Sequence, residues 1–357
     1  MASPKLVPGT LYFNRDRDYR TGAWGPYVKI GIVRQARSAE DRVKEHQTGN
    51  PREVLTTHTL DARMVEHLET QLHHRFALHW VSGEWFEMSQ EFVVDVVIPE
   101  ANIIIAEQTE FEADFKQQAE LKDSLSSGDS REPTEDERAD WACWKSAREA
   151  LILAQAKKQL ADLALRAAIG DACGISGVVR LVEKSGKPTL DRKALEAAHS
   201  ELCAGYLKPR DPAVKGSLLC KGALSLAKLD ADLADRVKTA KAAKATFTAA
   251  HVSTGVAPAT RTDAHRALHA EFVQSIGAVA RADWDVERWA ARLARRVGED
   301  DAIEGLVVWK RMLKAQSPTF DQKAFKADHP ELFEQHLKPA RTSVSVDILF
   351  HRPYAVA

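Results

Sequence analysis

The first ninety residues contain side chains whose types could support hydrolysis of an anionic substrate. They are Tyr12, Lys29, Arg42, His46 and Glu69. Arg42 and His46 are four positions apart, so on a helix they lie one turn apart and point the same way. Hydrolysis of a phosphodiester needs an activated water, neutralisation of the phosphate charge and a cation that assists the leaving oxygen. These residue types could supply those needs if the fold brings them together.

Each residue also has a simpler interpretation. Tyr12 could be an ordinary strand aromatic, Arg42 and Lys44 plain surface charge, and Glu69 a solvent-facing helix residue beside the apolar Leu68. The histidine run His67, His73, His74 and His79 invites a zinc site. It offers no pair at i,i+4 spacing with a third ligand, so it favours supporting or structural roles. Glu84 and Trp85 are expected to close the core of this region.

The surrounding pattern predicts a small α/β unit of about 100 residues in the order strand, strand, helix, strand, helix. Strands are expected at 10–13, 27–33 and 54–60, with a long hairpin loop at 14–26. Helices are expected at 38–46, capped by Ser38, and from a cap at Asp61 to about Leu78, with a further helix capped by Ser89. Gly31, inside the second strand, indicates a bulge or a close backbone approach.

Several of these segments together resemble the GIY-YIG nuclease superfamily. The first strand is Leu11-Tyr12-Phe13, the second contains Lys29-Ile30-Gly31, and Arg42 follows eleven residues after that glycine. LETQLHHRF, followed by SGEWFEM, is similar to a phage- and bacteria-associated branch that is often described as a DNA-binding domain. The resemblance covers about residues 8–95, a quarter of the chain.

The resemblance implies a role for each residue. Glu69 would hold one divalent ion, expected to be Mg²⁺. Arg42 would bind the phosphate oxygens with its planar fork. Tyr12 would orient or deprotonate the attacking water, and His46 could share that duty. Lys29 replaces the second motif tyrosine, so it either anchors the phosphate or indicates a branch that binds DNA without cutting it.

Composition limits the classes of protein that remain. The chain has 357 residues, 28% of them charged, and a net charge of −1. Two or three domains are expected at this length. No apolar run reaches the roughly 20 residues that span a bilayer, and the N-terminus has no apolar signal region. The four cysteines form no CxxC pair, which favours free thiols and a cytoplasmic protein without a membrane partner.

A DNA partner would have to contact local basic surfaces, because the chain as a whole is not basic. The candidate DNA contacts are Arg34, Arg37 and Lys44 near the candidate site, and Arg288, Arg292 and Arg295 on a later helix. That later group could equally be the solvated face of an amphipathic helix. Residues 106–140 carry twelve acidic and four basic residues.

The rest of the chain contains an internal repeat. PTLDRKALEAAHSELCAGYLKP at 188–209 matches PTFDQKAFKADHPELFEQHLKP at 318–339, an offset of 130, and twelve of the 22 positions are identical. Each copy is predicted to contain a long helix, a Gly turn, a short strand and a second helix capped by Asp191 or Asp321. The second copy resembles the helical tail of YqaJ-type phage recombination nucleases. The repeat could be a helical spacer, an oligomerisation arm or a further DNA-binding surface.

The expected fold is therefore an α+β N-terminal domain followed by a mainly helical region with a tandem repeat and short strands. The expected divisions are a nuclease or DNA-binding domain at 1–110, an acidic linker at 111–140, repeat modules at 141–212 and 281–357, and a helical connection at 213–280. The leading functional hypothesis is a metal-dependent DNA endonuclease from a phage or mobile element. The alternatives are a non-catalytic DNA-binding protein on the same fold and a phage or prophage assembly factor without affinity for nucleic acid.

Overall fold

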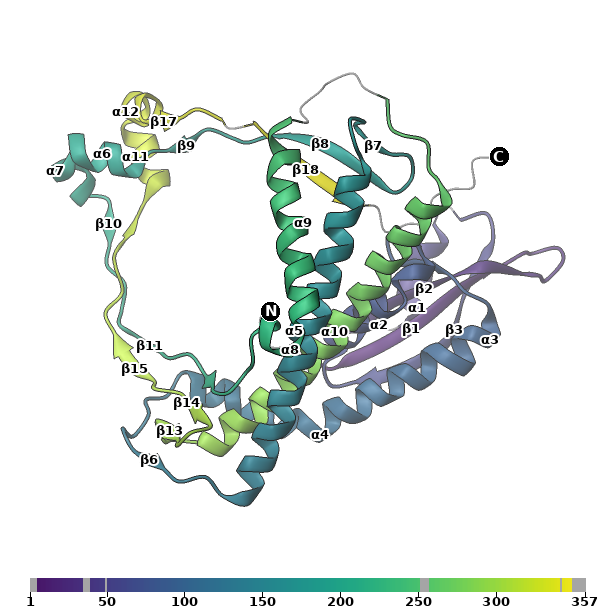
Figure 1. Cartoon of the computed structure of the whole chain (residues 1–357), viewed down its shortest axis with the longest axis horizontal. Coiled ribbons are helices and arrows are strands. Elements are labelled where there is room, and N and C mark those ends of the chain that lie inside the picture. Colours follow the sequence, from purple (N-terminus) through teal and green to yellow (C-terminus); the bar gives the residue numbers. More distant parts are fainter. Residues whose placement is uncertain (1–4, 35–38, 49, 251–256, 341, 349–357) are drawn as a thin grey trace.

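The computed structural model describes residues 5–34, 39–48, 50–250, 257–340 and 342–348. Its N-terminal part is a five-stranded antiparallel sheet in the order β3-β1-β2-β5-β4 (Figure 1). The strands are β1 (Gly9–Arg17), β2 (Trp24–Arg34), β3 (Glu53–Ala62), β4 (Trp80–Ser82) and β5 (Trp85–Glu87). A mainly helical region with short strands follows, so the predicted fold class is confirmed.

The first two strands are longer than the sequence predicts. Residues 14–26 were expected to form a loop, but only 18–23 lie between β1 and β2. The polar residues at the end of β1 have partners within the sheet. Arg15, for example, is buried and donates from Nη2 to the carbonyl of Gly25 at 2.7 Å. Paired polar groups tolerate burial, so a charged segment can continue a strand.

The helices of the N-terminal part lie between residues 39 and 122. They are α1 (Ala39–Gln47), α2 (Val65–Arg75), α3 (Gln90–Phe92) and α4 (Ile98–Lys122), with short turns at Ala77–His79 and Val93–Val97. Ser89 caps α3 as predicted, since its side chain accepts from the Phe92 amide. The predicted cap at Asp61 is wrong, because Asp61 remains in β3 and accepts from the Thr10 hydroxyl at 2.7 Å. Ser38 lies outside the described residues.

The segment predicted as an acidic linker is largely helical. α4 continues to Lys122, and α5 (Glu135–Ala168) begins after Thr134, which forms a capping box with Glu137. Only 123–134 lies between the two helices, and it contains the short strand β6 (Ser130–Arg131). The run of acidic residues is typical of a linker exposed to solvent. In the structure, several of these residues form ion pairs with arginines of a later helix.

That later helix, α10 (Asp263–Val297), joins the two parts of the molecule. It packs along α5 and also contacts α2 and α4. Trp284 of α10 is buried, stacks on Phe115 of α4 with ring centroids 5.5 Å apart, and contacts His67 of α2 at 4.2 Å. Glu107 of α4 accepts from the Trp284 indole at 2.8 Å. The N-terminal sheet is therefore held to the helical region by a packed and hydrogen-bonded contact.

The two repeat copies do not form separate modules, because their strands pair with each other. The first copy contributes β7 (Gly174–Ile175), β8 (Val179–Ser185), β9 (Thr189–Leu190), α6 (Arg192–Ala198), α7 (Ser200–Ala204), β10 (Leu207–Lys208) and β11 (Ala213–Lys215). The second contributes β13 (Ala302–Ile303), β14 (Val307–Val308), β15 (Met312–Lys314), β16 (Thr319–Phe320), α11 (Gln322–Asp328), α12 (Pro330–Gln335), β17 (Leu337–Lys338) and β18 (Thr342–Ile348). Asp191 and Asp321 cap their helices as predicted.

The pairing between the copies is related by a local two-fold symmetry. β10 pairs with β16 and β9 with β17, in registers that the offset of 130 interconverts. The same holds for β8 with β18 and β15 with β11. The ion pairs Lys208–Asp321 and Lys338–Asp191 repeat the relation, at 2.6 and 3.1 Å. The repeat is thus one symmetric unit built by exchange of strands.

The remaining elements lie between the copies. They are β12 (Leu219–Cys220), α8 (Leu226–Leu229) and α9 (Ala231–Ala250), and α9 packs on α5. The sequence predicts a helical connection at 213–280, and the structure adds the short strands β11 and β12 at its beginning. All four cysteines are free. None of the helices in the described part of the chain is long and apolar enough to cross a membrane.

Candidate functional site

The two faces of the central strands β1 and β2 have different surroundings. Leu11 and Phe13 of β1 point into the main core of the N-terminal part, together with Val28 and Ile30 of β2. The alternate residues of β1, Tyr12 and Asn14, face the other way because side chains alternate along a strand. In the sheet register Tyr12 is paired with Gly31 and Asn14 with Lys29. These alternate residues form the floor of the candidate site.

Helix α1 brings two further predicted residues to this floor. The rings of Tyr12 and His46 lie 5.9 Å apart, and His46 Nδ1 lies 3.2 Å from the Asn14 side-chain amide. Arg42, one turn earlier on α1, lies close enough to Tyr12 to influence its ionisation. The predicted alignment of Arg42 and His46 on one helix face is therefore confirmed.

Tyr12 and Arg42 contact each other beneath α1. Tyr12 is fully buried. Burial raises the pKa of Tyr12, and a hydrogen bond with Arg42, together with the charge of Arg42, opposes that rise. The same hydrogen bond raises the pKa of Arg42, which also forms an ion pair with Glu45. The guanidinium is therefore held in place beside the Tyr12 hydroxyl.

Glu69 reaches the site from α2. Burial, reinforced by the negative charge of Glu84, raises the pKa of Glu69 to about 7, and the charge of Lys29 opposes the rise. Lys29 forms an ion pair with Glu84, which directly precedes β5. A carboxylate held near neutrality beside a second carboxylate is an arrangement that a cation would relieve.

His46 is neutral, and Asn14 contacts its ring. Burial and the charges of Lys29 and Arg42 lower its pKa below the usual value, so the ring is neutral at pH 7. Asn14 contacts Nδ1 of His46, and Thr56 Oγ1 lies 2.8 Å from the other amide atom of Asn14. Both contacts survive a flip of the amide. In the amide orientation of the structure, Asn14 Nδ2 donates to His46 Nδ1, so the neutral ring carries its proton on Nε2. With the amide turned, the Asn14 oxygen accepts from Nδ1–H and Nε2 of His46 is free to take a proton.

The structure brings all five predicted residues together and adds two that the sequence analysis missed. Glu84 was expected to close the core, but its side chain is 40% exposed and paired with Lys29. Asn14 was placed in a loop. Its position two residues after Tyr12 was the available signal, because that spacing selects the same strand face.

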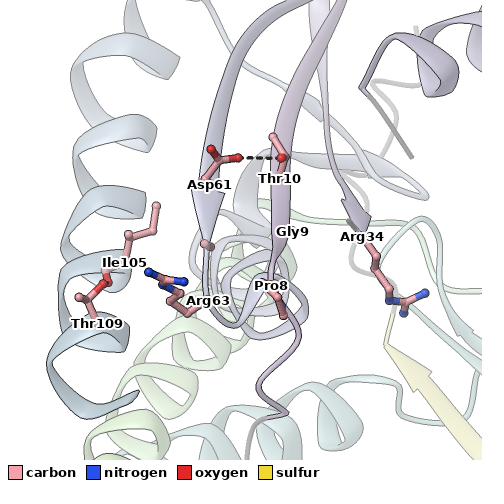
Figure 2. Close-up of a pocket in the computed structure, with 9 residues that line it drawn as sticks. Pro8, Gly9, Thr10, Arg34, Asp61, Arg63, Ile105 and Thr109 are labelled. Atoms are coloured by element: carbon pink, nitrogen blue, oxygen red, sulfur yellow. Dashed lines mark hydrogen bonds between the residues drawn. The ribbon is translucent and has the colours of Figure 1, made fainter. Parts of the chain in front are cut away.

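The predicted DNA contacts near the site have ordinary surroundings. Arg34 is exposed and pairs with Glu66, and Lys44 is exposed with Asp41 at 3.9 Å. Arg37 lies outside the described residues. Arg34 also lines a cavity of about 630 Å³ beside the first residues of β1 and the last residues of β3. Arg63 lines the same cavity and lies near Ile105 and Thr109 of α4 (Figure 2). None of the five candidate catalytic residues lines that cavity.

The later arginines all have acidic partners, although the side chain of Arg295 is also 51% exposed. Arg288 lies 3.5 Å from Glu107, while Arg292 and Arg295 lie 3.0 and 3.2 Å from Asp114 of α4. The Asp114 side chain is 2% exposed. These arginines therefore help to hold α10 against α4, and their contact with DNA stays a prediction.

Among the histidines, His67 lies at the joint between α2 and α10, where burial lowers its pKa to about 4. His73 lies 2.9 Å from the Ile30 carbonyl, His79 lies 3.2 Å from the Glu87 carbonyl, and His74 lines a cavity with Lys158. The described residues hold no group of three His, Cys, Asp or Glu side chains arranged for a metal ion. Any cation at Glu69 would therefore take most of its ligands from water and substrate.

The raised pKa of Glu69 gives a pH-dependent stability that can be measured without turnover. The folded state holds the proton more tightly than the unfolded chain, so this contribution is full below pH 4.5 and is lost as pH rises through about 7. The Glu69→Gln variant cannot ionise at this position, so its stability does not fall with pH for this reason. In EDTA the variant should gain about 1–3 kcal/mol over the original chain between pH 5 and pH 8. Denaturant unfolding measures the difference, and Mg²⁺ at pH 8 should narrow it. A difference that is independent of pH would contradict the assignment.

Comparison with known proteins gives one match. Residues 9–99 match the family model of the T5orf172 domain. This finding corrects the family assignment made from the sequence, because the matching model is T5orf172 and not GIY-YIG. The matched range contains the whole candidate site and ends before the helical region, so it lends no support to the resemblance to YqaJ-type tails. No curated protein and no solved structure matches the chain.

Proposed function

We propose that the chain is a metal-dependent DNA endonuclease whose site consists of Tyr12, Lys29, Arg42, His46 and Glu69. The observation that supports it is the convergence of these side chains, from β1, β2, α1 and α2, on one electrostatically coupled cluster. The cluster combines cationic groups, a neutral histidine and a carboxylate of raised pKa. Groups with shifted pKa values and specific charged neighbours are typical of catalytic sites.

In this proposal the phosphate is bound by Arg42 and Lys29. Arg42, which contacts Tyr12 and Glu45, has a planar guanidinium that suits two phosphate oxygens. The Lys29 ammonium supplies a positive charge to the phosphate while it also contacts Glu84. With the Asn14 amide turned so that its oxygen accepts from Nδ1–H, neutral His46 takes the proton of the attacking water at Nε2. The Tyr12 hydroxyl, kept protonated by its raised pKa, orients that water by hydrogen bonding.

The donor set fits a hard divalent cation such as Mg²⁺. Such an ion commonly binds one or two carboxylates and keeps several waters, and Glu69 supplies one carboxylate with Glu84 nearby. When bound, the ion would polarise the phosphate and stabilise the leaving oxygen. Glu69 holds it only when deprotonated, so its affinity should rise as pH passes 7.

The second candidate is a DNA-binding protein of the same fold without turnover. The ion pair between Lys29 and Glu84 favours it, because Glu84 is then neutralised without a cation. Both candidates use the same positive groups for phosphate, and they differ in whether Glu69 holds a metal.

Incubation of the chain with supercoiled plasmid, with Mg²⁺ or with EDTA, tests the proposal. Nicking that requires the cation supports the endonuclease. Retardation of the DNA on a gel without nicking at any pH from 6 to 9 overturns it in favour of the binding protein. Absence of both nicking and retardation overturns both candidates.

A further inference from the structure

The symmetric repeat unit projects two narrow ribbons away from the helices. The first ribbon pairs 207–215 with 312–320, and the second pairs 186–190 with 337–340. They meet at a small tip built from α6, α7, α11 and α12, whose core contains Leu195, Phe325 and Phe333. Figure 1 shows the ribbons and the tip as a loop that extends from one side of the molecule.

The part of the first ribbon formed by β11 and β15 belongs to none of the hydrophobic clusters of the described residues. Met312, Leu313 and Lys314 are consecutive, so they point to both faces of the ribbon, and all three are exposed. An isolated two-stranded ribbon is marginally stable in water. Its position between the tip and the helical body holds it in place, yet both faces remain available to a ligand.

The ribbons are strongly basic although the chain is not. Their segments, 186–190, 207–215, 312–320 and 337–340, contain six Lys or Arg residues and one Asp or Glu, whereas the net charge of the chain is −1. Lys208 and Lys338 have acidic partners at 2.6 and 3.1 Å. Lys187, Arg210, Lys215 and Lys314 are exposed, and no acidic partner is found for them among the described residues.

We propose that these ribbons are a second nucleic-acid-binding surface, which binds the phosphate backbone of duplex DNA. The inference rests on the proposed function for the choice of DNA as the partner. Basic side chains that are not neutralised supply the electrostatic attraction that dominates such binding. The major groove of B-form DNA admits a two-stranded β-ribbon, and its sides are lined by phosphates. The ribbons therefore position the duplex, and the N-terminal site carries out the chemistry.

The test compares two triple variants in EDTA, where no cleavage occurs. The ribbon variant carries Arg210→Ala, Lys215→Ala and Lys314→Ala. The control variant carries Lys5→Ala, Lys116→Ala and Lys157→Ala, three exposed lysines outside the ribbons. Fluorescence anisotropy with a 30-base-pair duplex is measured from 50 to 300 mM salt. The ribbon variant should bind at least about ten-fold more weakly, with a salt slope reduced by about 2–3, because three phosphate contacts are lost. The control should keep the original slope.

Equal affinity and slope for both variants would overturn the inference. So would tighter binding of duplex RNA than of DNA, because side chains cannot enter the narrow major groove of the A-form. Plasmid nicking by the same proteins separates this inference from the proposed function. Binding that is weakened by the ribbon substitutions, without any nicking, would support the ribbon surface and overturn the endonuclease. Nicking together with binding that the ribbon substitutions do not change would support the endonuclease and overturn the ribbon surface.

Discussion

Glu69→Gln should abolish metal-dependent nicking and leave DNA binding nearly unchanged. Gln has almost the same shape as Glu, so the packing of α2 is preserved, but it has no charge with which to hold a cation. Loss of the cation removes several kcal/mol of transition-state stabilisation. The expected fall in nicking rate is about 10³-fold or more, which corresponds to roughly 4 kcal/mol. The rate is measured on supercoiled plasmid in saturating Mg²⁺ at pH 8, where wild-type Glu69 is deprotonated.

Binding affinity in EDTA is the companion measurement. The phosphate contacts proposed for the site come from Lys29 and Arg42, and neither is altered, so affinity should stay within about three-fold. Glu112→Gln provides a matched control, because Glu112 is an acidic residue on α4 whose one ion pair within the described part of the chain is with exposed Arg63. It should change neither quantity. A Glu69→Gln protein that nicks as fast as the Glu112→Gln protein would show that Glu69 holds no catalytic metal.

The sequence predicted much of the candidate site because short-range periodicity determines it. The two-residue period of a strand places Tyr12 on one face of β1, and the four-residue spacing places Arg42 beside His46 on α1. The local hydrophobic stripe also placed Glu69 on a helix. These features depend on neighbours in the chain, and local pattern conveys them well.

The parts that were missed depend on pairing between distant segments. Glu84 joins the site only because β5 pairs with β2 and brings it to Lys29. Residues 111–122 of α4 were predicted to belong to an acidic linker, because the arginines that neutralise Asp114 lie about 180 residues later on α10. The exchange of strands between repeat copies was hidden for a similar reason, since each strand has the same local pattern whether it pairs within its own copy or with the other.

Gly31→Ala should damage both the stability of the N-terminal part and its proposed activity. Gly31 is paired with Tyr12 across β1 and β2, and the Tyr12 ring lies directly over it. A methyl group at position 31 would lie 2.7 Å from Cζ of Tyr12 and 3.1 Å from Cε2. The strand glycine thus marks a close approach, as predicted, and its backbone has no positive φ. Space, rather than backbone freedom, requires glycine here.

Tyr12 cannot avoid the added methyl by moving into solvent, because its side chain is fully buried beneath α1. Overpacking of this kind costs about 1–3 kcal/mol, and any shift of the ring also moves Oη away from Arg42. Denaturant unfolding and plasmid nicking should therefore both decline. Gly205→Ala is the control, since the nearest atom there, the Leu202 carbonyl oxygen, is 3.4 Å away. It should change stability by no more than about 0.5 kcal/mol.

A double variant identifies Tyr12 as the cause of the loss. Tyr12→Leu shortens the side chain and removes the atoms that the methyl group would meet. Gly31→Ala should then cost much less in the Tyr12→Leu background than in the original chain, with a coupling of about 1–3 kcal/mol. Nicking should not recover, because the Tyr12 hydroxyl is absent. Additive losses would show that the glycine is needed for another reason, and recovery of nicking would remove Tyr12 from the proposed chemistry.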